Sequence, residues 1–232
     1  MIRKDNIIHM GVVTVLPQTI KNPVSLIGEY AGHCYGSDIS NSKKNYKRGL
    51  ECVKSGHGRT LEFCDVHLQL DGWSIRTMRE FMRHVSDGLT ALQSSTRYIN
   101  ESNFDYFTPD QIRKDEDNKS VYDSCMEEIR KSYEYLLSNG VKKEDAANIL
   151  PLGLTGTLVI KKNARALQTM SEVRLCTRAY HEYRDLMRKI VKELKNYSDE
   201  WAVLADLIFK PKCEVRGYCE EEYSCGRYPK KI

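Results

Sequence analysis

The run "LTGTLVIKKNARALQTMSEVRLC", residues 154–176, changes its hydrophobic period halfway along. In the first half, Leu154, Leu158 and Ile160 share one side of an alternating pattern, which predicts a half-buried strand. Asn163 then occupies a position typical of a helix N-cap, and the residues after it predict a helix that runs to about Cys176. A strand that passes directly into a helix indicates a fold that mixes both elements.

The flanking sequence repeats this mixture. A run rich in β-branched residues at 7–16 predicts a buried strand. Strict alternation at 63–71 predicts a second strand, with Val66, Leu68 and Leu70 on one face. Helical spacing predicts helices over 23–35, 42–56, 74–85, 117–138, 142–150 and 178–195. In the helix over 74–85, the expected apolar stripe consists of Ile75, Met78, Met82 and Val85. We expect one α/β (α+β) domain over residues 1–209, followed by a Cys- and charge-rich tail over 210–232.

The composition is that of an ordinary soluble protein. The 232 residues are 41% hydrophobic and 29% charged. No apolar run approaches the roughly 18 residues of a membrane span, and the N-terminus lacks the apolar stretch of a secretory signal. The net charge of +4, from 36 basic and 32 acidic residues, is too small to indicate nucleic-acid binding. We therefore expect a cytoplasmic protein with reduced thiols and neither a membrane nor a nucleic-acid partner.

The segment "RHVSDGLTALQSSTRY", residues 83–98, concentrates polar and basic side chains. Arginine binds phosphate or carboxylate bidentately, and serine or threonine hydroxyls with loop amides complete anion sites. The segment is therefore consistent with a phosphate loop between Arg83 and Arg97. A solvated helix end followed by an ordinary turn explains the same pattern, and the pattern alone slightly favours that alternative.

Two further segments contain candidate ligand groups. Arg174 stands between Val173 and Leu175 on the helix after Asn163, and a half-buried arginine requires an anionic partner or a ligand. The stretch "GHGRTLEF", residues 56–63, contains His57, Arg59 and Glu62, and its glycines suit either a cofactor contact or a plain helix-to-strand turn.

The tail places Cys213, Cys219 and Cys225 six residues apart. Three cysteines without a CxxC pair or an obvious fourth ligand are a poor zinc motif, so free thiols are favoured and no metal is expected. The chain also lacks GxGxxG, Walker, HExxH and GxSxG motifs, which makes a Rossmann dinucleotide site improbable.

Taken in order, several motifs resemble those of the flavin-dependent thymidylate synthases. They are "GHGRTLEF", "MREFMRH", "SSTRY", "LPLGLTGTLVIKKNAR" and "MSEVRL", spread over roughly residues 10–195. The family signature is Arg-His-Arg, seven residues, then Ser-x-Arg. This chain has Arg83-His84-Val85, nine residues, then Ser95-Thr96-Arg97. At the third signature position this chain has the uncharged Val85, and its loop between the two halves of the signature is two residues longer. Glu80 stands where the family usually has a glutamine, three residues before the signature arginine. Ala147 stands where the family usually has an arginine, just before Leu-Pro-Leu.

The resemblance implies an antiparallel sheet packed with helices, in a homotetramer whose subunits share active sites. It implies reductive methylation of dUMP to dTMP, with FAD as cofactor and methylenetetrahydrofolate and NADPH as co-substrates. Arg174 would stabilise charge on the uracil ring as the catalytic residue. The implied dUMP contacts are Glu80, Arg83, Gln93, Ser94, Ser95, Thr96, Arg97 and Arg174. The implied FAD contacts are Arg59, Arg83, His84, Val85, Gln93, Asn163, Ala164, Arg165 and Thr169.

Two alternatives remain open at this point. A related flavoenzyme with altered nucleotide or one-carbon chemistry would use the same scaffold, since the departures from the signature touch ligand contacts. A nucleic-acid-binding protein that uses the face from Arg83 to Arg97 and the basic tail is disfavoured, because acidic residues are interleaved and no recognition motif is present.

Overall fold

Four strands form an antiparallel sheet in the computed structural model, which describes residues 11–84 and 89–231. The strands are β1 (Val12–Val15), β2 (Asp65–Ser74), β3 (Thr90–Gln93) and β4 (Thr155–Asn163), and their order in the sheet is β1-β2-β4-β3. The expected α+β class with an antiparallel sheet is confirmed.

The two alternating segments of the sequence become the two longest strands. Val66, Leu68 and Leu70 of β2 are fully buried, as their shared parity predicts. The strand expected over 7–16 is present as β1, and residues 7–10 lie outside the described residues. The short strand β3 falls in a segment that the sequence analysis assigned to a polar loop. Its side chains alternate between exposed and half-buried, so it has almost no hydrophobic signal.

Helices make up most of the rest of the chain. They are α1 (Pro23–Cys34), α2 (Ser42–Lys54), α3 (Ile75–Met82), α4 (Asp110–Arg113), α5 (Glu116–Ser138), α6 (Lys143–Ala146), α7 (Ala164–Arg174), α8 (His181–Tyr197), α9 (Asp199–Ile208) and α10 (Lys212–Arg216), with short 3-10 turns at Gly58–Phe63 and Ala147–Ile149. Each helix expected from hydrophobic spacing is present within a few residues of its expected bounds. The separate helix α9 was not expected, and it begins after Ser198, whose side chain accepts a hydrogen bond from the Trp201 amide.

Helix α3 buries the expected stripe only in part. Thr77, Met78 and Phe81 are buried, whereas Ile75 and Met82 are only half-buried. The fourth member of the expected stripe, Val85, lies outside the described residues. A helix of eight residues completes barely two turns, so a small rotation changes which side chains face the core.

Contacts divide the described chain into two compact units. The first contains residues 11–12, 70–81 and 92–159, and the second contains 13–69, 82–84, 89–91 and 160–231. The Cys-rich segment after residue 209 belongs to the second unit, and its expected separation from a catalytic domain stays a prediction.

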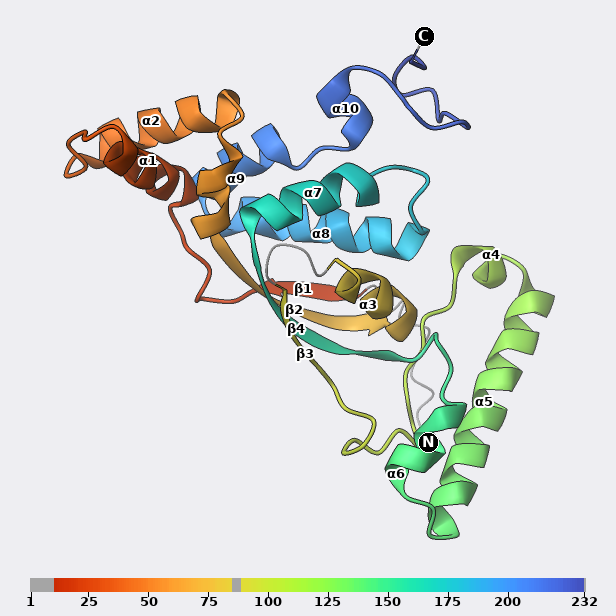
Figure 1. Ribbon diagram of the computed structural model, residues 1–232. Helices are drawn as coiled ribbons and strands as arrows, with labels where there is room; N and C mark the ends of the chain where they lie inside the picture. The colour runs from red at the N-terminus through yellow and green to blue at the C-terminus, as the bar shows by residue number, and fades with distance from the viewer. Residues whose placement is uncertain (1–10, 85–88, 232) are drawn as a thin grey trace. The chain divides into compact units, whose positions relative to one another are not determined.

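The second unit is built on closely packed helices. Figure 1 shows α1 beside α2, and α7 beside α8. Helices α1 and α2 approach so closely that a Cβ added at Gly28 would lie 1.7 Å from the Asn45 carbonyl oxygen, so a side chain there would force the helices apart. Trp201 of α9 is fully buried, and its indole N–H donates to the Ile20 carbonyl at 2.7 Å.

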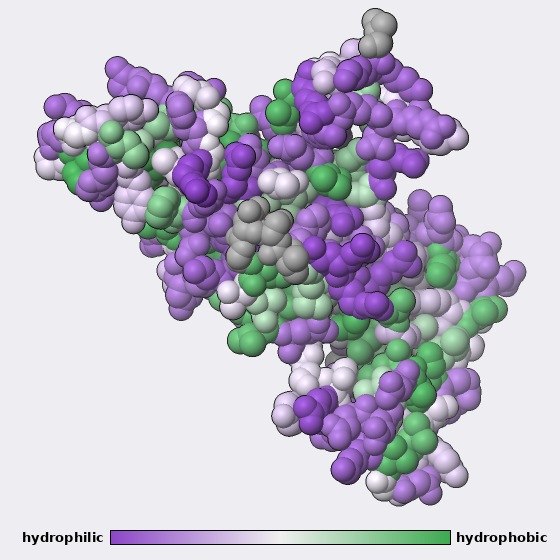
Figure 2. Space-filling view, viewed as in Figure 1, coloured by the Kyte–Doolittle hydropathy of each residue, from purple (hydrophilic) through white to green (hydrophobic). Residues whose placement is uncertain are grey.

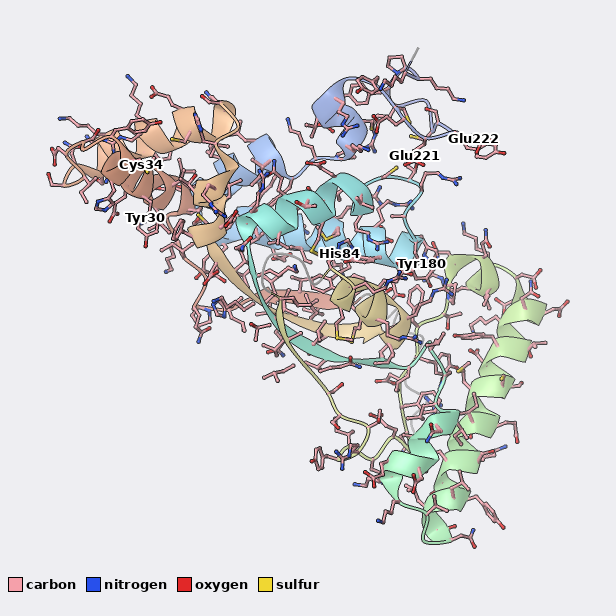
Figure 3. The ribbon with its side chains drawn as sticks, in the orientation of Figure 1. Tyr30, Cys34, His84, Tyr180, Glu221 and Glu222 are labelled. Carbon is pink, nitrogen blue, oxygen red and sulfur yellow. The ribbon has the colours of Figure 1, made fainter. Side chains whose placement is uncertain are left out.

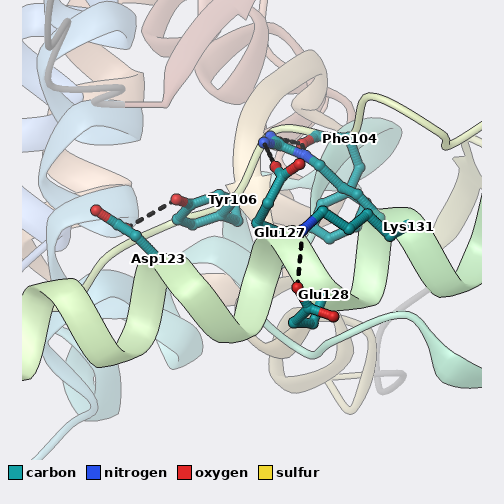
Figure 4. Close-up of polar contacts among 7 residues, drawn as sticks. Phe104, Tyr106, Asp123, Glu127, Glu128 and Lys131 are labelled. Carbon is teal, nitrogen blue, oxygen red and sulfur yellow. Dashed lines mark hydrogen bonds and ion pairs between the residues drawn. The ribbon is translucent and has the colours of Figure 1, made fainter.

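The first unit has an aromatic core against the long helix α5. Phe104, Met126 and Leu154 are buried together, and Tyr106 and Tyr122 pack against them. Figure 4 shows polar contacts along this helix, including the Tyr106 hydroxyl donating to Asp123 at 2.8 Å. Buried aromatic rings and satisfied hydroxyls therefore fix α5 to the segment before it.

None of the helices in the described ranges has the length and apolar character needed to cross a membrane.

Candidate active site

His84 and Arg174 meet in the second unit although ninety positions separate them in the sequence. The Arg174 Nε donates to the His84 Nε2 at 3.0 Å. The Arg174 guanidinium also lies over the buried Tyr183 ring, 4.5 Å from its centroid, and the His84 ring meets the Tyr183 ring edge to face. Figure 3 shows His84 close to α7 and α8, which carry these partners. An aromatic face and an imidazole together fix the guanidinium plane.

The imidazole of His84 is neutral at physiological pH. Its burial, followed by the charges of Arg174, Lys162 and Arg83, lowers the pKa of His84 to about 4. Because Nε2 accepts a hydrogen bond, the neutral ring carries its proton on Nδ1. The charges of Arg174, Lys162 and Arg83 all act on this imidazole and contribute positive potential around it.

The helix start at residues 163–165 lies against the turn before β2. Asn163 caps α7 by accepting a hydrogen bond from the Ala166 amide at 2.8 Å, as its position predicts, and the Ala164 amide donates to the Cys64 carbonyl at 2.9 Å. A Cβ added at Gly58 would lie 1.9 Å from a terminal nitrogen of Arg165. The structure therefore brings "GHGR" and "NAR" together, two motifs that the sequence analysis assigned to flavin.

A cavity of about 710 Å³ opens beside this turn. Its wall includes the aromatic rings of Tyr30, Tyr35 and Phe63, with Arg59 at its edge. Figure 3 shows Tyr30 and Cys34 on the helix that forms one side. Tyr30 and Phe63 pack edge to face with centroids 4.8 Å apart, and Arg59 is largely exposed in an ion pair with Glu62. Aromatic rings, a basic side chain and this volume suit a planar, phosphate-bearing cofactor.

The serine-rich loop lies in the first unit and is held to its own surroundings. The Ser94 amide donates to the Thr157 carbonyl, and the Ser94 hydroxyl accepts from the Thr157 amide at 3.2 Å. The Ser95 hydroxyl accepts from the Arg97 amide at 3.3 Å, which closes a turn. Arg97 pairs with Glu144 of α6 at 2.8 Å, and the Arg97 side chain is 64% exposed. The expected phosphate arginine thus has a carboxylate partner.

The remaining predicted site residues are divided between the two units. Gln93 ends β3 and Thr96 follows in the turn, and both are half-buried. Glu80 is half-buried on α3 in the first unit, whereas Thr169 is exposed on α7 in the second and donates to the Arg165 carbonyl. Val85 lies outside the described residues.

Several residues of these clusters were missed from the sequence. Lys162 is 1% exposed, and its parity in β4 matches that of Leu158 and Ile160, so the alternation did contain a signal for a buried cation. The helical spacing over 178–195 predicted Tyr183 only as one of the apolar residues packed into the core. Glu144 lies 47 residues from Arg97, and no local pattern links them.

Comparison with known proteins agrees with the order of these motifs. Residues 15–198 match the family model described as thymidylate synthase complementing protein. The flavin-dependent thymidylate synthase of Nitratidesulfovibrio vulgaris is 31% identical, over 89% of this chain and 91% of its own length. The enzyme of the same name from Clostridium tetani is 28% identical over 94% of both chains.

A solved structure shares the fold. The UMP/dUMP methylase PolB from Streptomyces cacaoi, bound with 5-Br dUMP, superposes with a TM-score of 0.69 at 18% identity, over 86% of this chain and 97% of that one. The fold and the matched sequence together define an enzyme family. The chain belongs to the thymidylate synthase complementing protein family, the flavin-dependent thymidylate synthases.

Proposed function

We propose that this chain is a cytoplasmic, FAD-dependent thymidylate synthase that reductively methylates dUMP to dTMP. Methylenetetrahydrofolate supplies the carbon and NADPH supplies the reducing equivalents. When bound, FAD would carry hydride from the reductant to the one-carbon unit transferred to the nucleotide. The protein's own contribution is to bind, to orient and to stabilise charge.

The Arg174–His84 pair is the observation that carries this proposal. An arginine held in plane by Tyr183 and by a neutral imidazole keeps its full charge and presents it in a fixed direction. Such a group stabilises negative charge that develops near N3 and O2 of a uracil ring. Arg174 is therefore the catalytic residue, and His84 positions it.

The second unit would supply most of the FAD contacts. The residues present fit this cofactor, because the Gly58 turn accommodates the Arg165 guanidinium where a Cβ would clash, and because an aromatic cavity with a basic edge lies beside that turn. The flavin-binding set we assign is Arg59, Arg83, His84, Val85, Gln93, Asn163, Ala164, Arg165 and Thr169. The arginines of this set would bind the FAD diphosphate.

The loop in the first unit would bind the nucleotide phosphate. Ser94, Ser95 and Thr96 supply hydroxyls and amides, and Arg97 supplies the counter-charge once it exchanges Glu144 for phosphate. Glu80, Arg83 and Gln93 complete the nucleotide set. We place this loop at the active site of a neighbouring subunit, which makes the functional unit a homotetramer with shared sites.

Two measurements test the proposal. Purified chain should be yellow and should release flavin on denaturation, and it should liberate tritium from C5-labelled dUMP only when folate and reductant are both present. A colourless chain that takes up no added FAD refutes the flavoenzyme assignment. Turnover of labelled UMP but not dUMP would instead establish the alternative, a related flavoenzyme with a changed nucleotide.

A further inference from the structure

The C-terminal segment, residues 210–231, follows the region that matches the family model, which ends at residue 198. Its short helix α10 packs against α7 within the second unit. A cavity of about 260 Å³ is lined both by this segment and by residues within 172–179, among them Arg174. Figure 2 shows a mainly hydrophilic surface over the segment, and its contacts with the turn after α7 are charged and aromatic.

The turn of residues 175–180 joins the two helices that orient the Arg174 side chain. Arg174 is the last residue of α7, and Tyr183, over which its guanidinium lies, is in the first turn of α8. The Thr177 carbonyl accepts a hydrogen bond from Arg184 of α8 at 3.0 Å, which ties the turn to that helix. The path of this turn therefore sets how the end of α7 meets the start of α8.

Arg178, in this turn, contacts two neighbouring residues of the C-terminal segment. Its Nε lies 3.9 Å from a carboxylate oxygen of Glu221, and its guanidinium lies over the Tyr223 ring, 5.6 Å from the centroid. Figure 3 shows Glu221 next to the loop between α7 and α8. One residue before Arg178, the Thr177 hydroxyl donates to the Cys225 sulfur and lowers the pKa of that thiol. Alternate residues of the segment therefore contact consecutive residues of the turn.

The segment is itself held in place next to these contacts. Glu220 pairs with Lys212 of α10 at 2.5 Å and also with Arg216 of the same helix. Cys219 is buried. Because these two residues immediately precede Glu221, the carboxylate that meets the turn starts from an anchored backbone.

We propose that Arg178 is a positioning residue for Arg174, and that the C-terminal segment acts through Glu221 and Tyr223 as a strap that fixes the turn after α7. The inference rests on the proposed function, since that function assigns the catalytic charge to Arg174. A guanidinium that stabilises developing charge is effective only while its position is fixed. By limiting the freedom of the turn, the strap keeps the Arg174 guanidinium over the Tyr183 ring.

The exposure of the strap contacts limits the size of their effect. The side chains of Arg178 and Glu221 are 55% and 50% exposed, and exposed ion pairs stabilise only weakly. Loss of the strap should therefore lower kcat less than loss of Arg174 does. KM for dUMP should stay close to that of wild-type chain, because Arg178 contacts the strap and not the nucleotide in this role.

The test is a double-mutant cycle in the full chain, followed by tritium release from C5-labelled dUMP. Arg178→Ala and Tyr223→Ala should each lower kcat about three- to tenfold, and the double variant should be no slower than the slower single variant, because both changes remove the same contact. Tyr223→Phe keeps the ring and should retain wild-type kcat. The matched control is Glu222→Gln, which changes the exposed carboxylate next to Glu221 and should also retain it.

A second measurement needs no turnover. Burial, and after it the charge of Arg174, lowers the pKa of His84 to about 4. When the strap is lost, the Arg174 guanidinium is no longer held beside the imidazole, so an NMR titration should show a higher pKa of His84 in Tyr223→Ala than in wild-type chain. Tyr223→Ala removes no charge, and Glu222→Gln should leave this pKa unchanged. A residue that only stabilises the fold would not move this pKa in the folded chain.

Three results would overturn the strap. They are wild-type kcat in folded Tyr223→Ala, losses in the two single variants that multiply in the double variant, and an unchanged pKa of His84 in folded Tyr223→Ala. Tyr223 is 68% exposed, so its variants keep the test valid if Arg178→Ala does not fold. Wild-type chain that releases no tritium would refute the proposed function, and the His84 titration would still decide whether the strap holds Arg174.

Discussion

Two arginines that the sequence marks as ligand groups have opposite kinds of partner. Arg174 donates to a neutral imidazole and lies on a buried ring, whereas Arg97 forms an exposed ion pair with a carboxylate. Each was expected to face an anion, and each is held by a side chain distant in sequence. The neutral imidazole of His84 adds no negative charge beside Arg174, whereas Glu144 offsets part of the charge of Arg97.

This difference indicates two ways of preparing a site. Arg174 is pre-organised, because His84 and Tyr183 fix its orientation before any ligand arrives. Arg97 must exchange one anionic partner for another, so its contribution to binding is the difference between two ion pairs. The first arrangement suits transition-state stabilisation, and the second suits reversible capture of phosphate.

Replacement of Arg174 should have the largest effect. Arg174→Ala removes the pre-organised charge, and we expect kcat for tritium release to fall about 10²–10³-fold, the range for loss of one pre-organised donor at developing charge. The control Arg188→Ala, an exposed arginine on α8 paired with Asp185, should leave kcat within about twofold. Equal loss in both variants, or normal turnover by folded Arg174→Ala, would remove Arg174 from its catalytic role.

The pH dependence of stability should follow from His84. Its pKa is about 4 in the folded chain and about 6.5 in the unfolded chain, so the unfolded state binds the extra proton first as pH falls. The unfolding free energy should therefore decrease between pH 6.5 and pH 4, by an amount that solvent screening at this half-buried side chain reduces. Urea titrations at several pH values measure this slope.

The matched comparison for this slope is between two histidine variants. His84→Asn should flatten the decline between pH 6.5 and pH 4, whereas His33→Asn, at an exposed position on α1, should not. An unchanged slope in folded His84→Asn would mean that this imidazole is not held neutral.

These two regions also separate what could be predicted from the sequence from what could not. Local patterns predicted β2, β4, the Asn163 cap and the long helices, because alternation, capping and helical spacing act between near neighbours. The short strand β3 was missed because its side chains are barely buried. The buried face of α3 was predicted only in part, because a helix of two turns defines its direction weakly.

The sequence identified the motifs of the candidate site but not which of their side chains contact each other. Family resemblance named Arg174, His84 and Arg97, yet nothing local indicates that Arg174 meets His84 or that Arg97 meets Glu144. Buried Lys162 could have been found from the parity of β4, since it continues the face of Leu158 and Ile160. Cys176 could not have been joined to the tail cysteines, because only the folded backbone brings them to one cavity.

Replacement of Arg97 should affect binding more than chemistry. Arg97→Ala removes the counter-charge of the nucleotide phosphate, and we expect KM for dUMP to rise about tenfold with kcat nearly unchanged, which corresponds to about 1.4 kcal/mol. Arg113→Ala, a surface arginine of the same unit paired with Asp110, is the control. A fall in kcat without a change in KM would place Arg97 with Arg174 as a transition-state group and remove the contrast between them.

The smallest expected effect tests the exchange itself. Glu144→Gln keeps an oxygen that accepts from Arg97 but removes the competing charge, so the arginine no longer has to leave an anion to bind phosphate. Because an exposed ion pair contributes only about 0.2–1 kcal/mol, KM for dUMP should fall by about two- to threefold while kcat stays the same. The control Glu128→Gln breaks a comparable exposed pair with Lys131 in the same unit and should leave KM unchanged. A KM that rises in Glu144→Gln would show that Glu144 orients Arg97 for the nucleotide, and then both arginines would be pre-organised, one by a neutral partner and one by a charged one.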